Sequence, residues 1–464
     1  MSLKRLIKKL PYSVQQSVKY IYGAIPPSIR YGKVFWETYK FLEISQWWSR
    51  EKLEEYQIQQ LKELLHHAYE NVPYYRKALD ERGLKPKDIQ EFNDLRKLPY
   101  LTKDIFKEHF NKFVAKNIKL NSLSISHTSG TSGKPLQFYT DESIMQRELA
   151  YIYHQWSRVG VEPGVPMVQL RGATIERKKP IDYDPMRKVL RLSPRIDNKE
   201  IASYYIEKIN QFGAKFLHGY PSAIAIFALL IKQHGFSVPF KLNAVLFASE
   251  AVYLWQREIT EEVFKCRIFS HYGIAEQVVL AGDCENTYYY HCIPQYGITE
   301  IDTENNEIIG TGFLNNINPF IRYRTTDVAS QSSYSGCSKC GRQYIPIFSS
   351  VEGRLEDFII TPKEVLISPA VITHPFKDFK TIKNSQIVQG NVNEVILKIV
   401  PWDDCDQTIL MEELKLLCQG FQTILGSDMN IRAEIVESIP LSKTGKFKWI
   451  ISEVSKDFLE KGIK

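Results

Sequence analysis

Apolar residues in the first part of the chain recur with the period of amphipathic helices. The clearest case is "REKLEEYQIQQLKELLHHAYENV", residues 50–72, where apolar positions fall close to every 3.6 residues. Proline has no backbone N–H and cannot continue a helix, so Pro73 is expected to end this one. We therefore expect residues 1–115 to form a helical N-terminal segment that packs on the rest of the chain. The apolar positions are Leu53, Tyr56, Leu61, Leu64, Leu65 and Ala68.

The pattern changes near residue 120, where short apolar runs rich in β-branched residues begin to alternate with helical stretches. The run "AKFLHGYPSAIAIFALLIKQHG" is followed by "NAVLFASEAVYLWQREITEEVF" and then by "CRIFSHYG". A repeated order of strand, turn and helix is typical of an α/β sheet with parallel strands. Residues 285–350 carry more strand and turn signals. We expect one large α/β domain with several sheets over residues 116–356.

The last hundred residues have a pattern of their own. The strand-like run "NEVILKIV" precedes "LMEELKLLCQGFQTIL", whose apolar residues share one helix face, and "NIRAEIVES" follows as a second strand-like run. We expect a small α+β domain over residues 357–464, with its boundary near residue 355. The apolar helix face consists of Leu410, Leu414, Leu417, Phe421 and Ile424.

The composition is that of a soluble globular protein with two or three domains. The chain has 464 residues, of which 44% are apolar and 24% charged. Its apolar runs stay short of the roughly 20 residues of a membrane-spanning helix, and "MSLKRLIKKL" at the start lacks the apolar core and cleavage site of a secretory signal. The seven cysteines are an odd number, which argues against a disulfide framework. We expect a cytoplasmic protein, either a monomer or a dimer.

The charge pattern argues against a nucleic-acid partner. The net charge is +7, but residues of both signs alternate along most of the chain, and no stripe of basic and aromatic residues stands out. A local excess at Lys4, Arg5, Lys8 and Lys9 has two interpretations. It is either a solvated helix face or a basic amphipathic segment that docks weakly on an anionic membrane surface, which would make the protein membrane-peripheral.

The stretch "SHTSGTSGKPLQFYTD", residues 126–141, has the composition of a phosphate-binding loop. Glycines let the backbone bend so that several N–H groups can face one anion. The spacing is not that of a Walker A motif, because two residues separate Gly130 from Gly133 and Pro135 follows the lysine. An ordinary surface turn is the alternative interpretation. As a phosphate site, the loop would contribute Thr128, Ser129, Gly130, Thr131, Ser132, Gly133 and Lys134.

Four later segments carry polar residues in positions suited to a nucleotide site. "SHYGIAEQ" places Tyr272, Gly273 and Glu276 after a strand, where the ring can stack on a base and the carboxylate can hold Mg²⁺. "FIRYRTTDVAS" places Asp327 at the end of a presumed strand, where it can accept hydrogen bonds from ribose hydroxyls. "EGRLEDFII" lies near the domain boundary, and "SIPLSKTGKFKWI" sets Lys446 in a glycine-bearing loop. Taken singly, each segment is also compatible with a turn, a salt bridge or solvated charge.

Together and in this order, the segments resemble the motifs of the adenylate-forming enzyme superfamily, which comprises acyl-CoA synthetases and adenylation domains. The corresponding motifs there are "TSGTTGKP", "YGxTE", "YRTGD", "GRxDD" and "PxTxxGK", and the match spans residues 128–446. Within the superfamily the chain resembles the phenylacetate-CoA ligase branch, specifically the CapK-type proteins associated with capsular polysaccharide biosynthesis. The narrower likeness lies in "SQWWSREKLEEYQIQQLKELLHHAYENVPYYRK", "LPYLTK", "HGYPS" and "CSKCGR". The resemblance implies an α/β fold with a large multi-sheet N-terminal domain and a small mobile C-terminal lid.

The resemblance also implies a reaction in two steps. A carboxylate attacks the α-phosphate of ATP to give an acyl adenylate and pyrophosphate, and a nucleophile then displaces AMP. Fixed N–H groups, Mg²⁺ and a lysine near the α-phosphate would stabilise the charge that develops. By position, Lys446 would be that lysine, Glu276 the Mg²⁺ ligand and Asp357 the hinge of the lid. The ribose would be held by Asp327 and Arg354, and the adenine side lined by Ser249 and Glu250.

The chain departs from the superfamily motifs at several positions. Ala275 stands where Thr or Ser is usual, Ser132 replaces a Thr, and Thr326 replaces the glycine of "YRTGD". The last change puts a β-branched residue where glycine is usual, and we expect it to alter the local backbone. The glycine-containing turn after the hinge is replaced by "TPKEVLISP". Because that turn lies beside the pantetheine arm in relatives that use a thiol, transfer to CoA stays open.

The segment "CSKCGR" has the spacing of half a zinc knuckle, with Gly341 permitting the turn between Cys337 and the residues after Cys340. The segment "DCENTYYYHCI" can supply the other two ligands. Four protein ligands would make the zinc structural rather than catalytic, and a pair of buried thiols without metal is the alternative. The favoured set is Cys284, His291, Cys337 and Cys340, with Cys292 a less favoured ligand, in an insertion at residues 284–341.

These observations predict an ATP-dependent ligase that activates a small carboxylic acid and transfers the acyl group to an amine, a hydroxyl or the thiol of CoA. The acceptor would be a sugar amine, an amino acid or CoA, and the setting would be surface polysaccharide biosynthesis. An aryl- or acyl-CoA ligase of the phenylacetate-CoA ligase type is one alternative, and a non-catalytic nucleotide-binding assembly factor is another. The expected cofactors are ATP, Mg²⁺ and structural Zn²⁺.

Overall fold

The computed structural model describes most of the chain. The described residues are 12–120, 123–128, 136–171, 180–194, 196, 198–351, 358–367, 369–372, 374–376, 379, 381–402, 405–439 and 449–454. The predicted phosphate-loop residues 129–134 and the predicted site residues Arg354, Asp357 and Lys446 lie outside these ranges.

The N-terminal part of the chain is helical, as its apolar period predicts. Helix α5 begins after Ser49, whose hydroxyl accepts a hydrogen bond from the backbone N–H of Lys52 and so caps the helix. It ends at Asn71, and Pro73 becomes the first residue of the next helix, where its missing N–H costs nothing. The helices are α2 (Tyr12–Ala24), α3 (Pro27–Arg30), α4 (Lys33–Ser45), α5 (Arg50–Asn71), α6 (Pro73–Asp80) and α7 (Lys103–Glu108).

A nine-stranded sheet forms the centre of the molecule, in the order β14-β10-β9-β8-β7-β6-β3-β5-β4. The strands from β8 to β5 run parallel, while β4, β9, β10 and β14 pair antiparallel with their neighbours. The strands are β3 (Met167–Leu170), β4 (Ile181–Asp184), β5 (Val189–Leu192), β6 (Phe216–Gly219), β7 (Ala244–Phe247), β8 (Arg267–Gly273), β9 (Leu280–Gly282), β10 (Tyr290–Cys292) and β14 (Ile347–Phe348).

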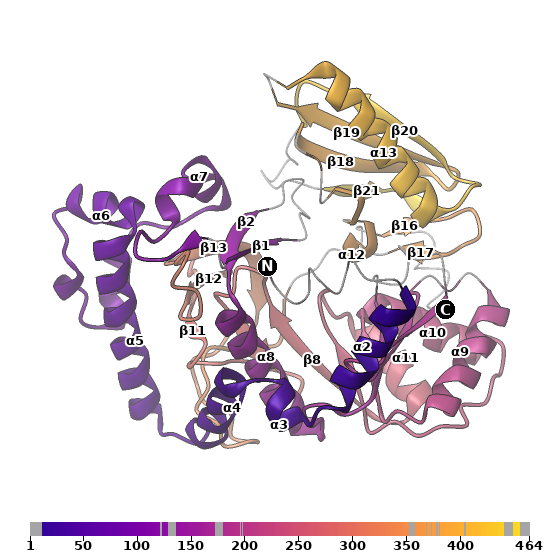
Figure 1. Ribbon diagram of the computed structural model, residues 1–464, viewed down its shortest axis with the longest axis horizontal. Helices are drawn as coiled ribbons and strands as arrows, with labels where there is room; N and C mark the ends of the chain where they lie inside the picture. Colours follow the sequence, from indigo (N-terminus) through magenta and orange to yellow (C-terminus); the bar gives the residue numbers. More distant parts are fainter. Residues whose placement is uncertain are drawn as a thin grey trace.

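Helices cover both faces of the parallel strands, which explains why β6 and β7 are buried at every position. On one face, Phe216, Leu246 and Phe269 pack in a cluster with Trp156 of helix α8 (Glu142–Trp156). On the other face, alternate strand residues pack in a cluster with helices α9 (Lys199–Phe212), α10 (Pro221–Gln233) and α11 (Leu254–Phe264), seen together beside the strands in Figure 1. The carboxyl ends of the parallel strands therefore share one edge between two layers of helices.

A second sheet lies beside the long helix α5 (Figure 1). Its strands are antiparallel and consist of β11 (Gly297–Ile301), β12 (Glu307–Gly312), β13 (Tyr323–Ser330) and β15 (Ser350–Val351). A separate hairpin pairs β1 (Ser124–His127) with β2 (Gln137–Thr140). Apolar residues of α5, α6, this hairpin and the second sheet form one continuous cluster.

The C-terminal part has its own sheet, which stands apart from the central sheet in Figure 1. Helix α13 (Gln407–Leu425) lies along this sheet and buries the apolar face expected from the sequence. Asp406 caps the helix by accepting hydrogen bonds from the N–H groups of Thr408 and Ile409. The strands are β18 (Ile382–Asn391), β19 (Glu394–Pro401), β20 (Asn430–Ile435) and β21 (Ile450–Ser452), and the short elements before them are β16 (Ile359–Ile360), β17 (Leu366–Ile367) and α12 (Pro369–Ile372).

Within the described ranges, no helix is both long enough and apolar enough to cross a membrane.

Candidate active site and metal centre

Thr128, the first residue of the predicted phosphate loop, closes the base of that loop. Its backbone N–H donates to the carbonyl of Leu136, and its hydroxyl accepts from the N–H of Leu136, both at 2.9 Å. The side chain is buried. These bonds extend the β1–β2 hairpin by one residue and bring the two ends of the loop together.

Glu276 lies in the turn after β8 and is buried. The phenol of Tyr323 donates a hydrogen bond of 2.8 Å to its carboxylate. Burial raises the pKa of Glu276 because water no longer stabilises the charge, while the phenol lowers that pKa by stabilising the ionised form. A buried carboxylate held in this way has the oxygen chemistry that Mg²⁺ prefers, so the residue fits the predicted role.

Two other predicted residues contact each other directly. The phenol of Tyr272 in β8 donates to Oδ2 of Asp327 in β13 at 2.8 Å. Burial, with Glu276 and Glu307 nearby, raises the pKa of Asp327 to about 6. The central sheet and the second sheet therefore meet at two tyrosine–carboxylate pairs, each of which joins a residue of the β8 segment to one of β13.

Asp327 lies at a bulge inside β13 rather than at the end of a strand. The pairing of β12 with β13 shifts register between Glu307 and Ile309, so residues 325–327 bulge out of the ladder. Thr326 has φ +65° there, in the left-handed region that glycine adopts easily. Its N–H donates to Glu307 at 2.9 Å. Although Thr326 is β-branched, its backbone thus adopts a conformation that suits the glycine usual at this position. The hydrogen bond to Glu307 holds the backbone in that conformation.

The predicted adenine-side residues lie at the carboxyl end of β7. Ser249 has φ +74°, and its hydroxyl accepts a hydrogen bond of 3.0 Å from Arg171, the residue after β3. Glu250 accepts from the backbone N–H of Ser222 at 3.1 Å. Because Ser222 is in the first turn of α10, the carboxylate also lies where the helix dipole favours negative charge.

The structure thus brings Tyr272, Glu276 and Asp327 together. Sequence reasoning missed Arg171, Glu307 and Tyr323, whose side chains form hydrogen bonds with Ser249, Thr326 and Glu276 respectively. Tyr323 lies inside the quoted "FIRYRTTDVAS" segment, so that motif contained the signal. Arg171 and Glu307 belong to no motif, and their contacts depend on how distant strands pair.

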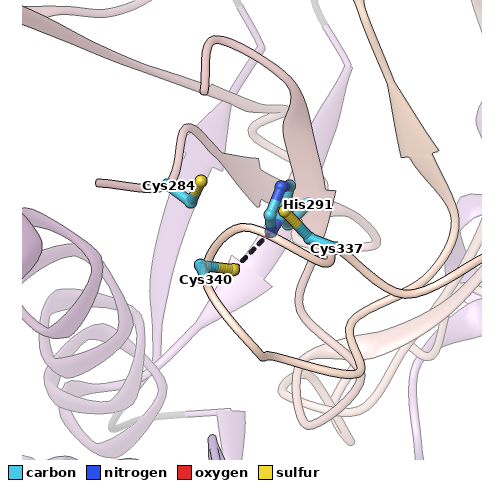
Figure 2. Close-up of side chains that lie close together, drawn as sticks. All are labelled: Cys284, His291, Cys337 and Cys340. Carbon is cyan, nitrogen blue, oxygen red and sulfur yellow. Dashed lines mark hydrogen bonds between the residues drawn. The ribbon is translucent and has the colours of Figure 1, made fainter. Parts of the chain in front are cut away.

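The four predicted zinc ligands also lie together (Figure 2). Their ligand atoms all fall within 4.8 Å of one another. Cys284 follows β9, His291 is in β10, and Cys337 and Cys340 come from the loop before β14. This compactness fits four ligands around one tetrahedral ion, because Zn–S and Zn–N bonds of about 2.0–2.3 Å place neighbouring ligand atoms roughly 4 Å apart.

The surroundings of the cluster also fit a metal. Nδ1 of His291 lies 3.7 Å from the sulfur of Cys340, and its buried Nε2 has no hydrogen-bond partner among the described residues. Backbone N–H of Asn286 donates to the sulfur of Cys284 at 3.4 Å, and the hydrogen bond from Cys340 lowers the pKa of Cys284. Gly341 has φ +76°, and its N–H bonds to the carbonyl of Cys337, which forms the knuckle turn.

Cys292, the less favoured ligand, is not in the cluster. Successive residues of a strand point to opposite faces, so Cys292 points away from the side on which His291 lies. It packs instead in the apolar cluster beneath α5, where burial raises the pKa of its thiol to about 12.

One ion pair joins the two cysteine-bearing segments of the cluster, and a hydrogen bond attaches them to the N-terminal helices. The two terminal guanidinium nitrogens of Arg342 donate to Glu285 at 2.7 Å, and its Nε donates to Gln46 at 3.0 Å. Strand pairing links the cluster to the nucleotide-side strand, because His291 pairs with Gly282, which pairs with His271 next to Tyr272. The Cys/His cluster therefore lies two strands away from β8 in the same sheet.

Comparison with known proteins agrees with this architecture. Residues 359–453 match the family model of the CapK C-terminal domain. Protein CapK of Staphylococcus aureus is 25% identical over 96% of this chain and 98% of its own length. The phenylacetate-coenzyme A ligase of Escherichia coli K12 is 40% identical over 99 residues, which are 21% of this chain and 22% of that ligase.

Among solved structures, 2-hydroxyisobutyryl-CoA ligase with 2-HIB-AMP and CoA in its thioesterification state superposes with a TM-score of 0.59. The two share 16% sequence identity over 90% of this chain and 93% of that one, so the likeness concerns the fold. The α/β fold class predicted from the sequence is confirmed. The chain therefore has the adenylate-forming enzyme fold, matches the CapK C-terminal domain model over residues 359–453 and is similar to protein CapK over nearly its whole length.

Proposed function

We propose that the chain is an ATP-dependent, AMP-producing ligase that activates a small carboxylic acid. The observation that carries the proposal is the convergence of Tyr272 with Asp327 and of Tyr323 with Glu276, at 2.8 Å each, where the central and second sheets meet. Two recessed carboxylates and two aromatic rings at the carboxyl edge of a parallel sheet suit a nucleotide with its metal ion. The likeness to CapK and to the CoA ligases supports the same reaction class.

In the first step a carboxylate oxygen of the acid attacks the α-phosphorus of ATP, and the bond to the pyrophosphate oxygen breaks. Asp327 accepts hydrogen bonds from the ribose, Glu276 provides the carboxylate that holds Mg²⁺, and Lys446 donates to the α-phosphate as charge builds up. Bound Mg²⁺ would neutralise charge on the phosphates. In the second step a nucleophile attacks the acyl carbon, and AMP leaves with the electrons of the broken C–O bond.

The acceptor is an amine, a hydroxyl or the thiol of CoA, and surface polysaccharide biosynthesis is the proposed setting. The likeness to CapK supports that setting, and the ligase relatives support CoA. The segment after the proposed hinge bears on the choice between CoA and the other acceptors, because in relatives that use a thiol the turn at this place lies beside the pantetheine arm. Residues 361–365 form a turn closed by hydrogen bonds between Thr361 and Val365, with Glu364 at φ +60°. Adding CoA or amines to an enzyme loaded with acyl adenylate, and identifying the product by mass, tests which acceptor is used.

The four-residue Cys/His cluster is proposed to hold structural zinc. The weak membrane docking expected of the basic N-terminus has some support in helix α2, where Tyr20 and Ile21 are exposed by 58% and 70%. Cosedimentation with anionic and neutral vesicles tests this docking, which should weaken in high salt.

Release of pyrophosphate that depends on an added acid tests the proposed activity. Lys446→Ala should remove most of the rate and leave ATP binding nearly intact, because the lysine acts chiefly in the transition state. A non-catalytic nucleotide-binding role is the second candidate, and Ala275 at a position usually held by Thr or Ser favours it. If ATP binds but no acid in a broad panel elicits release, the second candidate replaces the first.

A further inference from the structure

Arg158 joins the end of helix α8 to the two segments that carry the Cys/His cluster. It lies in the 3₁₀ turn Ser157–Val159, which follows α8 directly. Its Nη1 donates a hydrogen bond of 2.9 Å to the carbonyl of Asp283, the residue before Cys284. Its guanidinium carbon lies 5.8 Å from the ring centre of Tyr344, in the segment that carries the other two cysteines. Arg158 therefore contacts both segments that supply sulfur to the cluster.

The rest of the Arg158 guanidinium faces the interior. Its Nε and Nη2 are buried and have no hydrogen-bond partner among the described residues. The ionisable groups close to it include Arg342, Glu285 and Cys340. Glu285 is engaged with Arg342, since it accepts from both terminal guanidinium nitrogens of that residue at 2.7 Å. An arginine cannot lose its proton in a protein, and a buried charge is costly unless an opposite charge compensates it.

A metal ion in the Cys/His cluster would create a buried anion next to this cation. Three thiolates and a neutral imidazole around a divalent ion leave one net negative charge. Cys284 and His291 are buried, so water has little access to that side of the cluster. The negative charge of a loaded cluster and the positive charge of Arg158 each require compensation, and their positions allow each to compensate the other.

We propose that Arg158 is the counter-ion of the metal centre, whose fixed positive charge balances the three thiolates and raises the affinity for a divalent ion. The inference rests on the structural zinc of the proposed function and adds a residue that is not a ligand. It also connects the metal centre with the central sheet. Arg158 follows Trp156 by two residues, and the indole of Trp156 packs on His218 of β6 and His271 of β8, with ring centroids 4.9 and 5.9 Å away.

The zinc affinity of the full-length chain, measured in competition with a chromophoric chelator, tests the proposal. Arg158→Met removes the charge and keeps an unbranched side chain, and its Kd for zinc should rise about 10- to 100-fold, as is typical when a group that supports the ligands is lost. Arg158→Lys keeps the charge without the planar guanidinium. Its Kd should therefore stay closer to that of the wild type than to that of Arg158→Met.

A second readout shows whether the four ligands stay in place. With saturating Co²⁺ instead of zinc, Arg158→Met and Arg158→Lys should both give the tetrahedral absorption spectrum of the wild type, because neither variant removes a ligand. A weaker affinity with an unchanged spectrum is the result expected of a counter-ion. A changed spectrum in Arg158→Met would show that this residue shapes the cluster and would overturn the proposal.

Arg30→Met is the matched control. Arg30 also donates to two backbone carbonyls, those of Gly23 and Met186, lies 5.3 Å from the ring centre of Tyr31, and has a buried Nη2 without a hydrogen-bond partner among the described residues. It lies beside the β4–β5 turn, at the edge of the central sheet opposite to β10 and β14. Arg30→Met should lower the stability of the protein as Arg158→Met does, but it should leave the Kd for zinc unchanged.

The outcomes separate this role from the metal centre itself. An unchanged Kd in Arg158→Met would overturn the counter-ion while leaving the zinc site in place. An equal loss of affinity in Arg158→Met and Arg158→Lys would also overturn it, because the guanidinium would then act through its hydrogen bond to Asp283 and not through its charge. If the wild-type protein binds neither zinc nor Co²⁺, the proposed metal centre is wrong, and the role of Arg158 is wrong with it.

Discussion

The phenol of Tyr323 and the carboxylate of Glu276, 47 residues apart in sequence, are joined by a hydrogen bond of 2.8 Å. The bond sets the charge of a residue that is proposed to hold Mg²⁺. Burial raises the pKa of Glu276, and the phenol opposes that shift by stabilising the ionised form. Tyr323 therefore keeps the carboxylate ionised at pH values where burial alone would favour its protonation.

Tyr323→Phe should lower activity most strongly at acid pH. Without the phenol, the pKa of Glu276 rises further, so less of the carboxylate is ionised at a given pH and the acid limb of the rate profile moves to higher pH. Loss of one hydrogen bond to a charged group should lower kcat/KM at neutral pH about tenfold. Pyrophosphate release measured as a function of pH checks both effects.

Tyr205→Phe is the matched control for this variant. It removes a tyrosine hydroxyl in α9 that donates to the carbonyls of Pro180 and Ser193 at 3.1 Å, without touching either carboxylate pair. The acid limb of the pH–rate profile of Tyr205→Phe should lie at the same pH as that of the wild type. An unchanged limb in Tyr323→Phe would show that the phenol does not govern the ionisation of Glu276.

Asp327→Asn should stabilise the fold while weakening nucleotide binding. The pKa of Asp327 is raised from 3.8 to about 6, so the folded state resists its ionisation. A raised pKa contributes stability that is complete below pH 4 and is lost as pH rises through 6. At neutral pH the charge therefore costs about 1–3 kcal/mol, which asparagine removes.

Urea unfolding at several pH values measures this effect. The gain of Asp327→Asn should be largest near pH 7 and fade as pH falls below about 4, where the wild-type carboxyl becomes protonated in the unfolded state as well as in the folded one. Asp428→Asn, an exposed residue paired with Lys363, should show no such gain. A gain that does not depend on pH would contradict the assignment.

The sequence predicted the parts of this site that depend on local pattern. Tyr272, Glu276 and Asp327 could be named because each lies in a short sequence motif, although Tyr272 and Asp327 lie within strands rather than after them. The apolar faces of α5 and α13 followed from their period. The contacts between motifs could not be predicted, because they depend on how β13 docks against the end of β8. That His291 and Cys292 do not both belong to the cluster was within reach of the sequence, because successive residues of a strand point to opposite faces. Only the structure shows that His291 is the one that does.

Arg171 shows a different limit. It follows an apolar strand and precedes no recognisable motif, so nothing local distinguishes it from the other basic residues of the chain. Its position becomes informative once the strand order places β3 next to β6, which brings the guanidinium to His218. The bulge at residues 325–327 could not be predicted either, because the register shift that creates it depends on how β13 pairs with β12 and not on the sequence of one strand.

Thr326→Gly should stabilise the protein by about 0.5–1 kcal/mol. A residue with a Cβ costs roughly 1–2 kcal/mol in the left-handed region, and glycine gives back part of that gain through its larger entropy in the unfolded chain. Urea unfolding checks the change. Gln331→Gly is the matched control, because this residue has φ +50° in the loop after β13, outside the nucleotide site.

The two glycine variants should gain similar stability but differ in activity. The loop around Gln331 bears no proposed site residue, so its activity should equal that of the wild type. Thr326→Gly should loosen the segment that aims Asp327 and raise the KM for ATP a few-fold. If Thr326→Gly is destabilised instead, the threonine makes contacts that outweigh the strain of its backbone.

Cys340→Ser should remove zinc and destabilise the fold. Purified wild-type protein is expected to contain one zinc per chain by elemental analysis, held by Cys284, His291, Cys337 and Cys340. At free zinc a hundredfold above Kd, linkage contributes about 2.7 kcal/mol to the free energy of unfolding. The free energy of unfolding should fall by about this amount in the variant, and also in wild-type protein treated with a strong chelator. Chelator added to the variant should change its free energy of unfolding little.

Cys292→Ala separates loss of metal from loss of a buried thiol. Cys292 is one residue from His291 and buried, but it lies outside the cluster. The variant should lose some stability through the small cavity it leaves, yet keep a full complement of zinc. His291 pairs with Gly282, which in turn pairs with His271, the neighbour of Tyr272 in the proposed nucleotide site. Zinc-free protein should therefore also bind ATP more weakly than the Cys292→Ala variant does, when the two are compared at equal stability. Wild-type protein that contains no zinc, or zinc that persists in Cys340→Ser but not in Cys292→Ala, would contradict the proposed ligand set.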